Sequence, residues 1–281
     1  MHAVGLLTAE LYELHDRSKF ELHAFSWSRE DGTPLRARIK AAFEHYHPLH
    51  GVSDRQAAEL IAETGIDVLV DLQGLTSGAR AAILTHRAAP VQVSYLGLPA
   101  TSAIPGVDWI LADRFVMPPE SLPYYTEKPI YLPHCYQVSD RQRVANPAPT
   151  RAEVGLPEDA FVFCAFNNNH KMSEPVWRCW MRVLRQVPGS VLWLTDGGRS
   201  GSNQRLRQQA QAAGVDPERL LFAGRVHHAE YLARYRLADL FLDTFSYNAG
   251  STALATFAAG LPMLTYPGEH YARRMGASLC Q

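Results

Sequence analysis

The chain has 281 residues, a hydrophobic fraction of 47% and a formal net charge of -1. This length suffices for one large or two medium domains, and the hydrophobic fraction supports a real core. The balanced charge argues against nucleic acid or an anionic membrane as a partner. No apolar run reaches the roughly 20 residues that a membrane-spanning helix needs.

In the first half of the chain, short apolar runs alternate with amphipathic segments. The N-terminal residues predict an amphipathic helix rather than a signal peptide, because Glu10 and Glu13 interrupt the apolar stretch and no basic start precedes it. The run at 66–74 is apolar throughout, which predicts a strand buried on both faces. Further strands are expected at 20–27, 90–97 and 107–113, and helices at 54–65 and 79–87. This order indicates a parallel sheet covered by helices.

Histidines and cysteines give no sign of a metal or disulfide framework. His45, His47 and His50 are irregularly spaced and no carboxylate pattern accompanies them, so their segment is interpreted as a polar surface loop without a metal. None of the cysteines forms a C-x-x-C pair, and a reducing cytoplasm is the expected location. The cysteines are at positions 135, 164, 179 and 280.

A proline-rich stretch at 114–157 is interpreted as a connection between two domains. Beyond it the alternation restarts, with strands expected at 160–167, 190–197, 219–225, 239–245 and 262–268 and helices at 173–189, 202–214, 228–238 and 251–260. We therefore expect two Rossmann-like domains in tandem, at 1–135 and 157–281, joined by a linker at 136–156.

Two strand ends in the second half carry residues suited to an anion, and doubly wound sheets bind ligands beyond such ends. Gly250 permits close approach of the backbone, and Ser251 and Thr252 open the following helix, whose N-terminus favours negative charge. An ordinary capped helix start is the alternative. Lys171 follows another strand through a run of asparagines and can reach a phosphate oxygen; a solvated loop lysine is the alternative.

The pattern of these residues narrows the class of ligand. The chain has neither a G-x-x-x-x-G-K-[ST] nor a G-x-G-x-x-G motif, which disfavours a nucleoside triphosphatase or a dinucleotide dehydrogenase. A nucleoside diphosphate held mainly by the second domain fits the residues better. Two-domain, metal-independent glycosyltransferases use basic side chains and helix N-termini to neutralise the leaving diphosphate.

Many motifs together resemble the catalytic region of the O-linked N-acetylglucosamine transferases that are associated with tetratricopeptide repeats. They occur in order over nearly the whole chain and include "LQGLTSGAR", "PVQVSYLGLPATS", "FCAFNNNHKM" and "RYRLADLFLDTFSYNAGSTA". The resemblance implies an α/β glycosyltransferase-B fold, with two facing Rossmann-like domains and parallel sheets, the first domain incomplete. It also implies inverting, metal-independent transfer from UDP-N-acetylglucosamine to serine and threonine hydroxyls of proteins, with no cofactor.

The resemblance also implies roles for individual residues. Lys171 matches the lysine that contacts the donor diphosphate and is needed for activity, and Ser251 and Thr252 match a hydroxyl pair that binds the diphosphate. His2 matches a histidine that contacts the donor sugar, and it is also a candidate general base because an imidazole titrates near neutral pH. Asn168 falls where the family has an amide side chain near the uridine, Leu96, Gly97 and Pro99 match a turn beside the sugar, and Thr76 matches a nearby threonine. His228 and Tyr231 stand where vertebrate members of the family carry a lysine and a histidine near the nucleotide.

Departures from the family pattern leave two alternatives open. The chain begins just before His2 and ends at Gln281, so family elements on both sides, and the repeats, are expected to be missing. Ala255 stands where the family has an acidic residue that binds the ribose hydroxyls. One alternative is therefore an impaired fragment or pseudoenzyme that retains nucleotide or partner binding. The other is a relative that uses a different nucleotide sugar, such as one of fucose or glucose.

Overall fold

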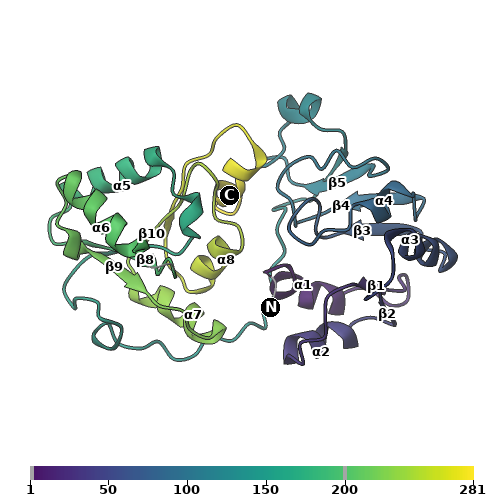
Figure 1. Ribbon diagram of the computed structural model, residues 1–281, viewed down its shortest axis with the longest axis horizontal. Coiled ribbons are helices and arrows are strands. Elements are labelled where there is room, and N and C mark those ends of the chain that lie inside the picture. The colour runs from purple at the N-terminus through teal and green to yellow at the C-terminus, as the bar shows by residue number, and fades with distance from the viewer. Residues whose placement is uncertain (1–2, 199–200) are drawn as a thin grey trace. The chain divides into compact units, whose positions relative to one another are not determined.

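The computed structural model describes residues 3–198 and 201–281, which divide into two compact units, each with parallel β-sheets (Figure 1). The first unit ends at Gln142 and the second begins at Arg143, a boundary that falls inside the segment expected to be a linker. Within the described residues, no helix is both long enough and apolar enough to cross a bilayer.

The first unit contains two separate parallel sheets. One pairs β1 with β2, and the other has the strand order β3-β4-β5-β6. The elements in chain order are α1 (Ala3–Glu13), β1 (His23–Ser26), α2 (Pro34–Ala41), β2 (His45–Pro48), α3 (Asp54–Glu63), β3 (Val68–Asp71), α4 (Ala82–Thr85), β4 (Val91–Ser94), β5 (Trp109–Ala112), η1 (Pro119–Tyr124) and β6 (Lys128–Tyr131).

Two expectations for this unit are wrong. The strand at 66–74 is not buried on both faces, because Val68 and Val70, which share one face of β3, are 52% and 42% exposed. The histidine segment is not a loop, because β2 pairs in parallel with β1. The proline-rich stretch also contains an unexpected strand, β6, which tolerates Pro129 because it is an edge strand.

The second unit is a single doubly wound sheet with the strand order β11-β10-β7-β8-β9. Every strand pair is parallel, as the alternation of strands and helices predicted. The elements are η2 (Ala152–Val154), β7 (Val162–Ala165), η3 (Asn169–Lys171), α5 (Glu174–Gln186), β8 (Val191–Thr195), α6 (Ser202–Ala212), η4 (Pro217–Arg219), β9 (Leu220–Ala223), α7 (His228–Arg234), η5 (Tyr235–Leu237), β10 (Leu240–Leu242), α8 (Ser251–Ala258), β11 (Met263–Leu264), η6 (Tyr271–Arg273) and α9 (Met275–Ser278).

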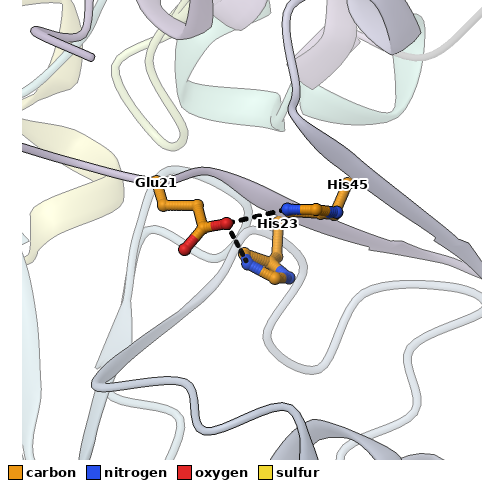
Figure 2. A group of neighbouring side chains, drawn as sticks. All are labelled: Glu21, His23 and His45. Carbon is orange, nitrogen blue, oxygen red and sulfur yellow. Dashed lines mark hydrogen bonds and ion pairs between the residues drawn. The ribbon is translucent and has the colours of Figure 1, made fainter. Parts of the chain in front are cut away.

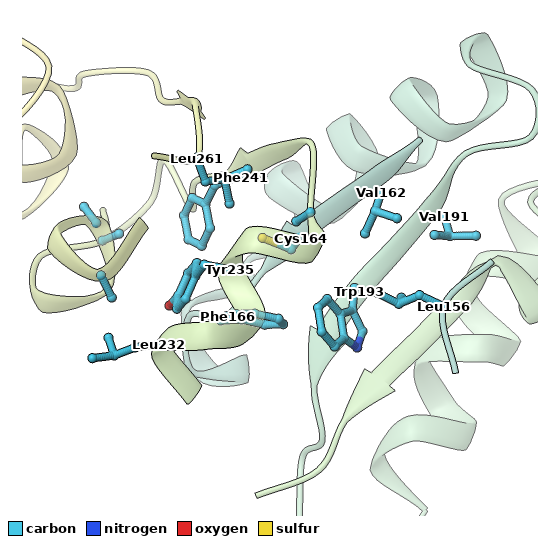
Figure 3. Packing of buried hydrophobic residues seen from close by; sticks show 14 residues of the cluster. Leu156, Val162, Cys164, Phe166, Val191, Trp193, Leu232, Tyr235, Phe241 and Leu261 are labelled. Atoms are coloured by element: carbon cyan, nitrogen blue, oxygen red, sulfur yellow. The ribbon is translucent and has the colours of Figure 1, made fainter. Parts of the chain in front are cut away.

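Successive side chains of β7 and β8 enter two different cores, because side chains of a strand alternate between the sheet faces. Cys164 and Trp193 pack against α7 and α8 through residues such as Leu232 (Figure 3). Phe163 and Leu192 point the other way, toward α5 and α6. Helices on both faces thus fix the sheet, and its strand ends form a rigid platform for the loops that follow.

Candidate functional site

The sheet of the second unit reverses its direction of winding between β7 and β10. From β7 the chain proceeds outward to β8 and β9, whereas β10 lies on the other side of β7 and is followed by β11. Because β7 and β10 are parallel neighbours, the loops that follow them, 166–171 and 243–250, leave the same edge of the sheet. Ligands of doubly wound folds bind at such a switch point.

Asp243 ties these two loops together. It is 4% exposed, and its Oδ1 accepts hydrogen bonds from the backbone amides of Thr244 and Ala249, at 2.7 and 2.8 Å, and from Asn167 Nδ2 at 3.2 Å. Its Oδ2 accepts from the Thr265 hydroxyl at 2.7 Å. Burial raises the pKa of this carboxyl, against the lowering effect of the hydrogen bonds. Sequence reasoning missed this positioning role, although an aspartate that ends an apolar strand is a visible signal.

Lys171 lies at the end of η3 with its ammonium group directed at the loop that follows β10. Its Nζ donates to the carbonyl oxygen of Asn248 at 3.1 Å and lies 4.1 Å from the ring centroid of Tyr247. Burial lowers the pKa of Lys171 to about 8, while the negative charge of Asp243 acts in the opposite direction. In the described part of the chain, no carboxylate forms an ion pair with this ammonium. Its charge is therefore available to an anion.

Helix α8 begins without a capping side chain. Gly250 occupies the position before the helix, and no side chain of the described residues caps it. Ser251 and Thr252 are half-buried and lie inside the helix as its first two residues, after the cap position, so neither provides the ordinary side-chain cap that was the alternative. The uncapped amides and the helix dipole favour negative charge at this end. Ala255, one turn later, is 3% exposed and packs in the core.

His228 and Thr252 are connected through Tyr231. The rings of His228 and Tyr231 stack with centroids 6.2 Å apart, and hydrogen bonds join the Tyr231 hydroxyl to the side chains of Thr252 and Tyr235. Burial raises the pKa of Tyr231 to about 12 and lowers that of His228, which favours uncharged rings. The structure thus brings the predicted residues of α7 and α8 together.

Several buried side-chain atoms of the described residues near this edge of the sheet have no hydrogen-bond partner. Asn168 is exposed and caps η3 by accepting from the amide of His170 at 3.4 Å. Buried polar groups are normally hydrogen-bonded, so unpaired ones indicate where a ligand or water binds. Among the described residues, such unpaired buried atoms include Asn167 Oδ1, Asn169 Nδ2, Asn248 Oδ1 and His228 Nε2.

The predicted residues of the first unit lie in the loops after β3 and β4, which are parallel neighbours. The Thr76 hydroxyl donates to the carbonyl oxygen of Gln73 at 2.8 Å. Leu96 has a φ of 67°, and a Cβ on Gly97 would lie 2.2 Å from the carbonyl oxygen of Leu72. This turn is therefore a strained backbone feature of the kind that gathers at functional sites.

Pro99, like Leu96 and Gly97, is half-buried. His2 lies outside the described residues, and its role stays a prediction.

Two α/β units with parallel sheets, the second with the ammonium of Lys171 and an uncapped helix start at its switch point, have the architecture of the glycosyltransferase-B fold. The chain matches the profile of Glycosyl transferase family 41 over residues 1–147 and 144–281, and it belongs to this family. The family and the fold class predicted from the motifs are thereby confirmed.

The relatives carry names that agree with the family. Over 99% of its length, the chain is 36% identical to the probable UDP-N-acetylglucosamine--peptide N-acetylglucosaminyltransferase SEC of Arabidopsis thaliana. It is 26% identical to the UDP-N-acetylglucosamine--peptide N-acetylglucosaminyltransferase of Caenorhabditis elegans, again over 99% of the chain. The chain spans 29% and 34% of the lengths of these two proteins.

Solved structures support the fold. A mutant of the Thermobaculum terrenum O-GlcNAc transferase superimposes with a TM-score of 0.91 at 29% identity, covering 99% of this chain and 52% of that one. Anabaena Alr3699/HepE, solved with UDP and glucose, has a TM-score of 0.55 at 12% identity, covering 99% of this chain and 85% of that one. The second likeness shows the fold alone.

Proposed function

We propose that this chain transfers N-acetylglucosamine from UDP-N-acetylglucosamine to serine and threonine hydroxyls of proteins, with inversion and without a metal. The observation that carries the proposal is the half-buried ammonium of Lys171, held 3.1 Å from the carbonyl oxygen of Asn248 beside the chain that leads into α8. A fixed cation and a helix N-terminus favour a diphosphate at the switch point of the sheet.

In the proposed reaction the acceptor oxygen bonds to the anomeric carbon as the bond from that carbon to the diphosphate oxygen breaks. The hydroxyl proton leaves to a base, for which His2 is the candidate from the sequence, and UDP departs with the bonding electrons. Negative charge therefore grows on the diphosphate, where the ammonium of Lys171 and the hydroxyls of Ser251 and Thr252 stabilise it. Such preorganised groups lower the barrier without reorganising during the reaction.

The names of the relatives support the donor and the acceptor in this proposal, since they specify UDP-N-acetylglucosamine and peptide. The remaining predicted residues, among them Asn168 and His228, are proposed to contact the nucleotide. Thr76 and the turn of Leu96, Gly97 and Pro99 are proposed to contact the sugar. A cytoplasmic location is proposed because all four cysteines are free thiols.

A donor panel tests the proposal. The chain is incubated with an acceptor protein and with UDP-N-acetylglucosamine, UDP-glucose or GDP-fucose, and intact-mass spectrometry records any sugar added. We expect addition of N-acetylhexosamine, in the presence of EDTA as well, and its loss in Lys171→Met. Lys19→Met is the matched control, because Lys19 is 70% exposed and pairs only with Asp16 in the described residues.

The other outcomes distinguish the alternatives. Addition of another sugar would replace the proposed donor. UDP binding without transfer to any acceptor would favour a binding module. The observation that favours this alternative is Ala255, which packs in the core where the family pattern has a carboxylate. Transfer that survives in Lys171→Met would contradict the assigned role of this residue.

A further inference from the structure

A cluster of imidazole and carboxylate groups lies on the two-stranded sheet of the first unit, and none of its residues belongs to the proposed donor site. His23 of β1 and His45 of β2 are directly opposite each other in the parallel register, and Glu21 precedes β1 (Figure 2). The Glu21 carboxylate lies 2.7 Å from His45 Nε2 and 3.8 Å from His23 Nε2. One carboxylate oxygen of Glu21 and the Nε2 atoms of His23 and His45 therefore lie close together.

We propose that Glu21, His23 and His45 bind one divalent transition-metal ion, with Zn²⁺ as the best match. One potential ligand atom from each residue lies within 4.8 Å of those of the other two. A tetrahedral zinc with bonds of about 2.0–2.1 Å needs its ligand atoms about 3.3 Å apart. Glu21 and His45 are exposed, so their side chains are free to make this adjustment.

A neighbouring residue supports the ligand geometry of His23. His23 Nδ1 lies 3.1 Å from His47 Nε2, so His23 donates through Nδ1 when its Nε2 faces the metal. The ring of His47 is itself held by stacking on Phe25, with centroids 4.6 Å apart and planes 11° from parallel. Metal-bound histidines characteristically donate their second ring N–H in this way, which fixes the tautomer and orientation.

The chemistry of the donor set selects the class of ion. Two imidazoles and a carboxylate make up a common zinc set, which leaves a fourth position for water. Mg²⁺ and Ca²⁺ prefer oxygen ligands, which this cluster lacks apart from one carboxylate. The spacing of histidines along the sequence did not reveal the set, because one imidazole comes from the neighbouring strand β1 and the carboxylate from just before that strand.

The expected consequence is a metal link between two strands. A two-stranded sheet is marginally stable by itself, and an ion that binds only the folded state stabilises that state. The transfer reaction proposed above uses no metal, so the two proposals fail independently. Loss of zinc binding would leave donor binding at Lys171 untouched.

The test uses the untagged full chain, freed of metal by a chelator, and titrates it with Zn²⁺ by calorimetry. We expect one equivalent to bind and to raise the melting temperature. In His45→Gln we expect affinity to fall at least tenfold and the rise in melting temperature to disappear. The control is His50→Gln, since His50 is an exposed histidine of the same segment outside the cluster.

Two further variants separate a ligand from a structural role. Glu21→Gln removes a charge from an exposed residue, and its folding should be unchanged while zinc affinity falls at least tenfold. His47→Phe keeps a stacking ring but removes the acceptor, so affinity should fall about tenfold with an unchanged melting temperature in the absence of metal. Absence of zinc binding by the wild-type chain, or equal binding by His45→Gln and His50→Gln, would overturn the proposal.

Discussion

Replacing Lys171 with methionine should stabilise the unliganded protein while weakening diphosphate binding at least tenfold. The two side chains have similar length and flexibility, but methionine carries no charge. Lysine in this half-buried position has its pKa lowered by burial from the ordinary value of 10.5 to about 8. Burying the ammonium therefore costs free energy in the folded state, and a ligand anion is what offsets this cost in the wild-type protein.

The magnitude follows from that pKa difference. At about 1.4 kcal/mol per pH unit, the change from 10.5 to about 8 corresponds to about 3 kcal/mol. The contact of the ammonium with the Tyr247 ring returns about 1 kcal/mol, and its hydrogen bond to the Asn248 carbonyl oxygen returns about 1 kcal/mol more, so Lys171→Met should gain about 1 kcal/mol. For a unit of this size the melting temperature should rise by about 2–4 °C.

The pH dependence gives the sharper test. Below about pH 8 the wild-type lysine is charged in both the folded and unfolded states, so the cost of burial is fully present. Between pH 8 and 10.5 the unfolded state binds more protons than the folded state, so wild-type stability rises with pH. The advantage of Lys171→Met over the wild type should therefore shrink through this window.

Urea denaturation at pH 7 and pH 10 measures this difference, with Lys19→Met as the exposed control. Addition of UDP at pH 7 should stabilise the wild type and leave Lys171→Met unchanged. The reasoning is refuted if Lys171→Met is no more stable than the wild type at pH 7, or if its advantage is the same at both pH values.

Three further predictions concern the predicted and newly found positions. Ser251→Ala and Thr252→Ala should each weaken UDP binding roughly tenfold, because each removes a hydrogen bond to a charged group; calorimetry that finds unchanged affinities would remove both residues from the site. Gly97→Ala should lower the free energy of unfolding, measured by urea denaturation, by about 1–3 kcal/mol, since its Cβ would lie 2.2 Å from the carbonyl oxygen of Leu72. A neutral result there would show that the turn relaxes. Asp243→Ala should cost about 3–5 kcal/mol in the same assay, because it leaves buried donors unpaired; a cost below about 1 kcal/mol would contradict its role in tying the loops together.

The second unit was predictable from the sequence to a large extent. Its central strands β7 and β8 are buried on both faces and read as continuous apolar runs, such as that around Trp193, and helix α5 has a clear apolar periodicity. The position of Lys171 and of Ser251 at strand ends followed from the same pattern. Their meeting at one edge depends on the strand order, which the chain alone does not state.

The first unit was less predictable because its residues divide between two small sheets, and the burial of its strands does not follow their apolar pattern. Val68 and Val70 are exposed although the run around them is mostly apolar, because they lie on one face of β3 that no other described element of the first unit covers. The strand that contains His45 and His47 is polar, and the pairing with β1 stabilises it rather than its own propensity. In the second unit, the role of Asp243 was not predicted because it depends on a hydrogen bond from Thr265, which is distant in sequence.

The central claim is that the second unit binds a nucleoside diphosphate through Lys171 and the start of α8. Titration calorimetry with UDP in the presence of EDTA tests it most directly, on the wild type, Lys171→Met and Lys19→Met. The account predicts heat of binding for the wild type and Lys19→Met, and at least a tenfold loss of affinity for Lys171→Met. Absence of heat with millimolar UDP for the wild type, or equal affinity in all three proteins, would contradict it.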